Sequence, residues 1–211
     1  MRRRPFTRLA LTALASGAAG TMLALTGCAG MSDAGWTTLI ADGQGLANFD
    51  AIGDANWRAE GGALVADKGK GGFLVSKAAY TDFMIRAEFW AETDTNSGIF
   101  LRLSDRKTVT AANSYEVNIW DIRPDPKYGT GAIVDFAAVP VPLANKAGGR
   151  WNVYEIEARG SKVSVRLNGV VTSTMDNGKF ASGPIALQYG PGVQGVQGGP
   201  IKWKKVQVRA L

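Results

Sequence analysis

Apolar and polar residues alternate along much of this chain with the two-residue period of a β-strand. The longest such run covers residues 83–91, where every odd position is apolar. Turn signals separate the runs, and Asn168-Gly169 is the strongest hairpin signal among them. Because no stretch longer than about ten residues has a convincing helical period, the pattern predicts an all-β fold. We expect a β-sandwich of two antiparallel sheets, with a jelly roll as its wiring.

Smaller features predict individual elements of this sandwich. Glycine-containing turns indicate two further hairpins, at Gly61-Gly62 and at Gly160-Ser161. The closing strand, residues 201–208, shifts register between Trp203 and Val206, as a β-bulge would make it do. Residues 132–136 are predicted as one more short strand.

Residues 114–121, Ser-Tyr-Glu-Val-Asn-Ile-Trp-Asp, are predicted to form the strand that carries a site. Strand alternation puts Glu116, Asn118 and Trp120 on one side. A carboxylate, an amide and an indole in a row suit a sugar, because they offer charge, hydroxyl partners and an aromatic face for a ring. The opposite side can belong to the core, and it carries Tyr115, Val117 and Ile119.

The predicted strand at residues 98–103 is apolar apart from Arg102. Burying an arginine without a partner costs several kcal/mol, so Arg102 needs one. Glu116 is the natural candidate if the two strands are neighbours. Such a pair is open to two interpretations, a structural ion pair or part of a functional site.

The composition limits the chemistry, because the chain has no histidine and one cysteine, Cys28. Reactive groups must therefore be carboxylates, amides, tyrosines or arginines. No cofactor is expected, and the one metal left open is an oxygen-ligated divalent ion such as calcium. Four of the 24 Lys and Arg residues precede Cys28, which leaves 20 cations against 18 acids. These charges are dispersed, so no nucleic-acid partner is expected.

The first 27 residues resemble a bacterial lipoprotein signal peptide. Four arginines precede a weakly apolar run that ends in the lipobox-like Leu25-Thr26-Gly27-Cys28. Acylation of Cys28 would anchor the chain to a membrane that it does not span, with residues 28–34 as a tether. An ordinary signal peptide is the alternative, and Arg3-Arg4 leaves twin-arginine export open. We expect a lipid-anchored protein of the bacterial cell envelope that faces the periplasm, at the outer membrane.

A series of short motifs runs through residues 35–211. It includes Gly35-Trp36, Asn96-Ser97-Gly98-Ile99-Phe100-Leu101-Arg102, Tyr115-Glu116-Val117, Trp151-Asn152, Leu167-Asn168-Gly169 and Gly183-Pro184-Ile185-Ala186-Leu187-Gln188. Their order and spacing resemble those of the 3-keto-disaccharide hydrolase domain family. The resemblance implies a concanavalin A-like, laminin G-like jelly roll and action on glycosides whose sugar is oxidised at C3.

The ketone of such a substrate defines the groups that a site must supply. It acidifies the C2 hydrogen, so a base can remove that proton and the enolate can expel the C1 substituent. A base, a stabiliser of the enolate oxygen and an acid for the leaving group are needed. The candidates are Glu116 as base, Arg102 as stabiliser and Asp121 as acid. Candidate carbohydrate-binding residues are Asn118, Trp120, Gln188 and Tyr189.

The chain departs from the family pattern at Tyr189-Gly190, where many members carry a histidine shortly after the Leu-Gln pair. This departure favours an alternative, a lectin-like lipoprotein that binds carbohydrate without cleaving it. Glu116 together with Arg102 favours the enzyme, a 3-keto-glycoside hydrolase or lyase. Asp121 is also open to interpretation as a turn cap, and Trp120 as a core residue.

Overall fold

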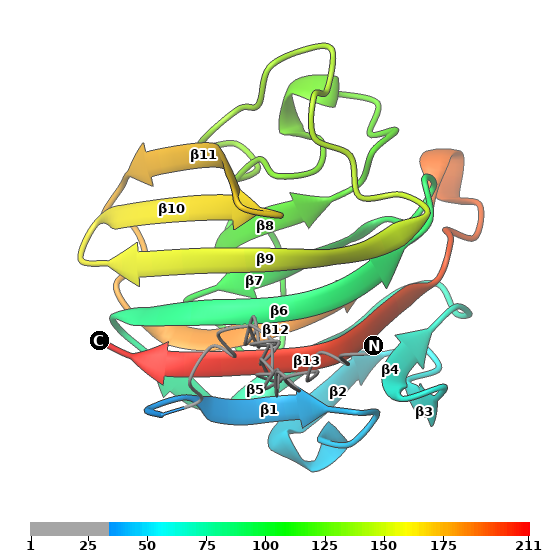
Figure 1. Ribbon diagram of the computed structural model, residues 1–211, viewed down its shortest axis with the longest axis horizontal. Coiled ribbons are helices and arrows are strands. Elements are labelled where there is room, and N and C mark those ends of the chain that lie inside the picture. The colour runs from blue at the N-terminus through cyan, green and yellow to red at the C-terminus, as the bar shows by residue number, and fades with distance from the viewer. Residues whose placement is uncertain (1–33) are drawn as a thin grey trace, which may run out of the picture. The chain divides into compact units, whose positions relative to one another are not determined.

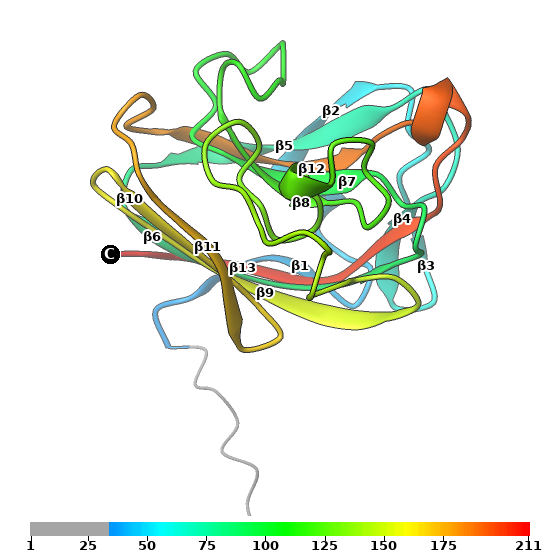
Figure 2. The ribbon, with the colours of Figure 1, turned by 90° about the horizontal axis from the view of Figure 1, so that it is seen from above.

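Two antiparallel β-sheets lie face to face in the computed structural model, which describes residues 34–211 (Figures 1 and 2). The large sheet has eight strands in the order β11-β10-β9-β6-β13-β4-β3, with β1 also paired to β13. The small sheet has five strands in the order β2-β5-β12-β7-β8. The predictions of a signal peptide at residues 1–27, of a tether at residues 28–34 and of acylation at Cys28 concern residues that lie outside the described part of the chain, apart from Ala34.

The strands of the large sheet are β1 (Thr37–Ala41), β3 (Arg58–Glu60), β4 (Ala63–Ala66), β6 (Phe83–Ala91), β9 (Arg150–Arg159), β10 (Lys162–Leu167), β11 (Val170–Asp176) and β13 (Ile201–Ala210). Those of the small sheet are β2 (Phe49–Gly53), β5 (Gly72–Tyr80), β7 (Ser97–Leu101), β8 (Tyr115–Ile119) and β12 (Gly183–Tyr189). The described helices are short 3₁₀ turns at η1 (Leu46–Asn48), η2 (Pro126–Tyr128) and η3 (Val193–Gly195). None of the helices in residues 34–211 has the length and hydropathy to cross a membrane.

The core lies between the two sheets and follows the alternation of the sequence. In β6 the odd positions from Phe83 to Ala91 are fully buried, while the even positions are partly exposed. Tyr115, Val117 and Ile119 of β8 join the same core cluster, as expected. Glu116 and Asn118 therefore lie on the outer face of the small sheet, the face turned away from the large sheet.

Several predicted elements are confirmed. The hairpins at Gly61-Gly62, Gly160-Ser161 and Asn168-Gly169 join β3 to β4, β9 to β10, and β10 to β11. The register of β13 against β6 shifts between Trp203 and Lys205, so the predicted bulge is present. The all-β sandwich itself is as predicted.

The predicted strand at residues 132–136 is wrong. Ile133 makes isolated bridges to Val117 and Ala137, and the chain then turns at Asp135, whose φ is 65°. The Ile133 carbonyl accepts hydrogen bonds from both Phe136 and Ala137 within this turn. The segment instead lies along the free edge of β8, where Val134 N donates to Glu116 O and Asn118 N donates to Ala132 O.

The expected ion pair between Arg102 and Glu116 does not form. β7 ends at Leu101, and Arg102 has a φ of 53°, which turns it out of the strand. Its buried guanidinium donates to three backbone carbonyls, those of Thr81, Gly160 and Phe180, at 2.5 to 3.1 Å. Asp82 Oδ1 lies 3.2 Å from Arg102 Nη2. Arg102 therefore ties together the turns at one end of the sandwich.

Two loops partly cover the outer face of the small sheet. The loop between β7 and β8 stands above this face in Figure 2, and its Leu103 and Val109 pack on Val75, Phe100 and Ala186. The long loop after β8, residues 120–149, begins at the edge of the sheet. The face between these loops contains Glu116.

Candidate functional site

Glu116 lies on the outer face of β8, the last strand of the small sheet, opposite Phe100 of β7. Its side chain is only 7% exposed, and no hydrogen bond or ion pair to its carboxylate occurs among residues 34–211. Most buried carboxylates are paired, because an isolated buried charge is costly. An unpaired carboxylate in this position is therefore a candidate for binding or chemistry.

Burial raises the pKa of Glu116 to about 7. The positive charge of Arg123 opposes this shift, and the negative charge of Asp135 adds to it. A carboxyl group with a pKa near neutrality can take up and release a proton at physiological pH. The environment of Glu116 thus suits a general base.

Gly98 of β7 leaves a narrow gap beside Glu116, which the methyl group of an alanine would already fill. A Cβ at this position would lie 3.5 Å from Glu116 Cγ and 3.6 Å from the side-chain oxygen of Gln188 on β12. It would also lie 3.0 Å from Val117 O, which is tighter than ordinary contact. The glycine therefore separates the carboxylate and the amide by a gap that any other residue would fill.

Predicted carbohydrate-binding side chains carry polar atoms that have no partner within residues 34–211. The side-chain oxygen of Gln188 and the indole nitrogen of Trp120 are buried and have no hydrogen-bond partner among the described residues. Buried polar groups are usually satisfied, so each of these atoms is a place where a ligand hydroxyl could bind. The ring of Trp120 also lies 5.7 Å from the guanidinium carbon of Arg123.

A hollow of about 500 Å³ adjoins Gln188. Its wall combines an aromatic side chain with charged groups, and includes Ile52, Asp54, Lys70, Phe73, Gln188 and Pro191. Gln188 borders both this hollow and the gap at Gly98, so the two are neighbours on the same face. An apolar surface with a few polar groups is typical of a small-molecule site.

Asn118 does not face open solvent, contrary to the expectation of a carbohydrate-binding side chain. It is fully buried, and its amide nitrogen donates to Tyr128 O at 2.6 Å. Its backbone carbonyl accepts a hydrogen bond from the Tyr154 hydroxyl at 2.6 Å. Asn118 thus fastens the loop after β8 to both sheets, although its side-chain oxygen has no partner.

Asp121 holds the two ends of the same loop together. Its carboxylate accepts hydrogen bonds from the Thr130 hydroxyl and from the amides of Ala147 and Gly148, at 2.6 to 3.1 Å. These contacts favour the interpretation of Asp121 as a turn cap over its predicted role as the acid for the leaving group, because its carboxylate oxygens already have these three partners.

Tyr189 is fully buried in the core between the sheets, and its hydroxyl donates to Gly198 O at 3.3 Å. Its ring therefore lies on the face opposite to the Gln188 side chain, although Tyr189 is also among the residues that line the hollow at Gln188, so its contact with a sugar stays a prediction. Strand alternation explains the difference, since consecutive residues of β12 point to opposite sides.

Sequence reasoning missed Arg123, Gly98 and Phe73. The charge of Arg123 reaches Glu116 and takes the place that was expected for Arg102. Its signal in the sequence is a cation two residues beyond the candidate strand. Gly98 lay within a motif that had been noted, but the need for a glycine there follows from the sheet order. In residues 34–211 no three His, Cys, Asp or Glu side chains cluster so as to hold a metal.

We expect Gly98→Ala to reduce kcat/KM for a sugar substrate by roughly tenfold, because the added methyl enters the gap between Glu116 and Gln188. Gly178→Ala is the matched control, since the nearest atom to its Cβ would be 3.9 Å away. Steady-state kinetics with thermal melts as a folding check would measure this. Full activity of Gly98→Ala would show that the gap is not used.

Solved structures with a similar fold include proteins related to carbohydrates. A candidate glycosyl hydrolase from Parabacteroides distasonis ATCC 8503 is 25% identical, with a TM-score of 0.65 over 83% of this chain and 99% of that one. The carbohydrate-binding module CBM66 from Bacillus subtilis is 16% identical, with a TM-score of 0.55 over 83% and 96%. A Bacillus subtilis protein of unknown function with a galectin-like fold is 10% identical, with a TM-score of 0.62 over 82% and 94%.

The last two similarities show the fold alone, a lectin-like, concanavalin A-like β-sandwich. A comparison with curated proteins finds no match. The sequence profile of one family covers nearly the whole of the described domain, from residue 35 to residue 209. This chain belongs to that family, the 3-keto-alpha-glucoside-1,2-lyase-like domain.

Proposed function

We propose that this protein cleaves glycosides whose sugar carries a ketone at C3, with Glu116 as the base. The observation that carries the proposal is the unpaired Glu116 carboxylate, with its raised pKa, on the outer face of the small sheet, beside the narrow gap at Gly98 and the hollow that Gln188 lines. Family membership supplies the substrate class, and the similar candidate glycosyl hydrolase agrees with it.

The reaction starts with transfer of the C2 proton to Glu116. The electrons of the broken C–H bond form the C2–C3 double bond of an enolate, with negative charge on the C3 oxygen. We assign the stabilisation of the enolate oxygen to Arg123, because the positive charge of Arg123 already lowers the pKa of Glu116. The assignment moves the stabilising role from Arg102 to Arg123.

The C1 substituent then departs. The enolate electrons form the C1–C2 double bond as the C1–O bond breaks, and the C3 ketone is restored. The leaving oxygen takes one proton, which balances the one removed from C2, and protonated Glu116 can supply it. Later addition of water to the double bond gives the net hydrolysis product, so one site serves as lyase or hydrolase.

Trp120 and Gln188 are the sugar-binding residues that we retain. The unpaired oxygen of Gln188 would accept a hydrogen bond from a ligand hydroxyl, and the indole nitrogen of Trp120 would donate one. Phe73, on the wall of the adjoining hollow, offers an aromatic surface for a second ring.

A second candidate function is carbohydrate binding without cleavage. The engagement of Asp121 in the loop favours it, because it removes the expected separate acid. In this alternative the same gap and hollow bind an intact saccharide.

The N-terminal pattern adds a location to the proposal. We place the protein in the bacterial cell envelope, anchored by acylation of Cys28 and facing the periplasm at the outer membrane. Its substrate or ligand is then a carbohydrate that reaches that compartment.

The activity should depend on pH through the ionisation of Glu116. The base acts only when ionised, and its raised pKa keeps it protonated in acid. We therefore expect kcat/KM to rise with pH and to reach half of its plateau near pH 7. A rate profile over the acidic and neutral range measures this. A half-point near the ordinary glutamate pKa of about 4.3 would contradict the role of the buried carboxylate.

The function is tested with a pair of chromogenic substrates, a 3-keto-glucoside and the same glucoside without oxidation. Release of the aglycone from the first alone is expected, because the unoxidised sugar has no acidified C2 hydrogen. Binding of either sugar without release, measured by calorimetry, would establish the second candidate instead.

A further inference from the structure

A group of tryptophans and cations occupies the outer face of the large sheet, on the opposite side of the sandwich from Glu116. We call it the tryptophan patch: Trp36, Trp90 and Trp151 with the cations Arg86, Lys202, Lys204 and Arg209. Trp90 of β6 and Trp151 of β9 are directly paired across the sheet. Trp151 is 44% exposed, a large value for a tryptophan.

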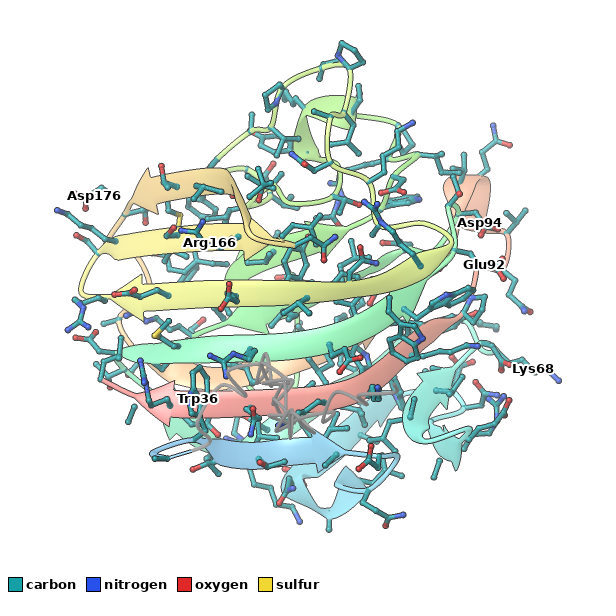
Figure 3. The ribbon with its side chains drawn as sticks, in the orientation of Figure 1. Trp36, Lys68, Glu92, Asp94, Arg166 and Asp176 are labelled. Atoms are coloured by element: carbon teal, nitrogen blue, oxygen red, sulfur yellow. The ribbon has the colours of Figure 1, made fainter. Side chains whose placement is uncertain are left out.

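Each tryptophan of the patch has a cation beside it. Trp36 lies between two arginines, with the Arg86 Cζ 4.5 Å and the Arg209 Cζ 5.0 Å from its ring. Figure 3 shows Trp36 over β13. Lys202 Nζ lies 4.5 Å from the Trp90 ring, and Lys204 Nζ lies 5.7 Å from the Trp151 ring. Aromatic and cationic groups are thus interleaved over the central strands.

The surrounding charges on this face are also mainly positive. Outward positions of β9 and β10 add Arg159, Lys162 and Arg166, against four acids, Glu88, Glu155, Glu157 and Asp176. Glu88 pairs with Lys204, and Glu157 pairs with Arg159. Tryptophan rings favour the boundary between lipid and water, and Lys and Arg favour anionic headgroups. The composition of the face therefore matches an anionic bilayer surface.

The start of the domain lies on the same face. Trp36 contacts the cations of β6 and β13 and directly precedes β1, so the chain enters the domain at the patch. Five residues lie between Cys28 and Ala34, and the six steps from one to the other can span at most about 20 Å. An anchor at Cys28 would keep the patch within that distance of the bilayer, where even weak contacts are favoured by high effective concentration.

We propose that the tryptophan patch docks the domain on the anionic membrane surface to which Cys28 anchors it. This proposal rests on the lipid anchor of the proposed function but not on the reaction. Docking through the large sheet turns the outer face of the small sheet away from the bilayer. The gap beside Glu116 then opens toward soluble glycosides.

The experiment uses the full lipidated protein in vesicles of phosphatidylcholine, with or without phosphatidylglycerol. A spin label on Val153→Cys reports from β9 beside the patch, and one on Ala79→Cys reports from the exposed part of β5 in the small sheet. With phosphatidylglycerol at low salt, we expect the label at residue 153 to enter the headgroup region while the label at residue 79 stays in water. High salt should release the domain.

Charge reversal provides the matched comparison. Lys202→Glu with Lys204→Glu should lower the ratio of docked to undocked domain by at least about tenfold, because two attractive charges become repulsive. Lys77→Glu with Lys107→Glu changes the net charge equally, on the small sheet and its loop, and should leave docking unchanged. Equal effects of the two double variants, or a label at residue 153 that stays in water, would overturn the proposal.

Two other outcomes also decide it. Immersion of that label on addition of a soluble saccharide, without phosphatidylglycerol, would make the patch a sugar surface and overturn membrane docking. If the mass of the purified protein showed no acyl groups on Cys28, the anchor would be absent and the docking proposal would be overturned. Cleavage of the 3-keto-glucoside in detergent is independent of both results, so failure here and failure of the catalytic proposal are distinguishable.

Discussion

Glu116→Gln is expected to lower the rate of 3-keto-glucoside cleavage by at least about a thousandfold, because an amide cannot accept the C2 proton. The substitution preserves shape, and no described residue donates a hydrogen bond to the carboxylate, so no partner is lost. Single-turnover kinetics with the chromogenic 3-keto-glucoside measure the effect. Glu155→Gln makes the same chemical change on the outer face of the large sheet and should keep the wild-type rate.

The stability of Glu116→Gln shows whether its loss of activity comes from removing a buried carboxylate with a raised pKa. The folded-state pKa of Glu116 is raised above its unfolded value, so the folded protein loses stability as the pH rises from about 4 to about 7. Above about pH 7, Glu116→Gln should be more stable than wild type by up to about 3 kcal/mol, and below about pH 4 the two should be alike. Equal cleavage rates for Glu116→Gln and wild type would defeat the assignment of the base, whatever the melts show.

Arg102→Met is expected to lower the free energy of unfolding by roughly 3–5 kcal/mol. The side chain supplies hydrogen bonds to the carbonyls of Thr81, Gly160 and Phe180, which methionine would leave unsatisfied in a buried setting. Urea unfolding at constant pH measures the loss. The effect should be on stability alone, since Arg102 lies away from Glu116.

Arg58→Met is the control for this substitution. Arg58 also pairs with carboxylates, those of Glu60 and Asp67, but its side chain is 36% exposed. Exposed ion pairs contribute about 1 kcal/mol or less, so a small loss is expected. A loss at Arg102 no larger than that at Arg58 would mean that the buried network is not a main support of the fold.

The fold could be predicted from the sequence because its information is local. Alternation assigned Tyr115 to the core and Glu116 to the outer face, and glycine turns placed the hairpins. The strand predicted at residues 132–136 failed because the segment makes a single bridge to the edge of β8 at Ile133 and then turns back on itself at Asp135. A short apolar segment looks the same whether it forms a strand or such a turn.

The site could be predicted only in part, because it depends on which strands become neighbours. The reasoning that Arg102 needs a partner was sound, but its partners are carbonyls brought together from three distant turns. Gln188 and Gly98 meet because β12 lies beside β7, and no periodicity reveals that order. Tyr189 differs from Gln188 by one position, and a strand places the two on opposite faces.

The hydrogen bonds of Asp121 have a consequence for how this family can diversify. They close the excursion from Thr130 to Ala147 at its base, and inside it residues up to Ala137 pack against β8 and the core. The length and sequence of residues 140–145, which make none of the described hydrogen bonds to a strand, can then vary with little effect on the sheets, since each doubling of loop length costs only about 0.6 kcal/mol. New specificities could arise by exchanging this single segment while the scaffold beneath it stays the same.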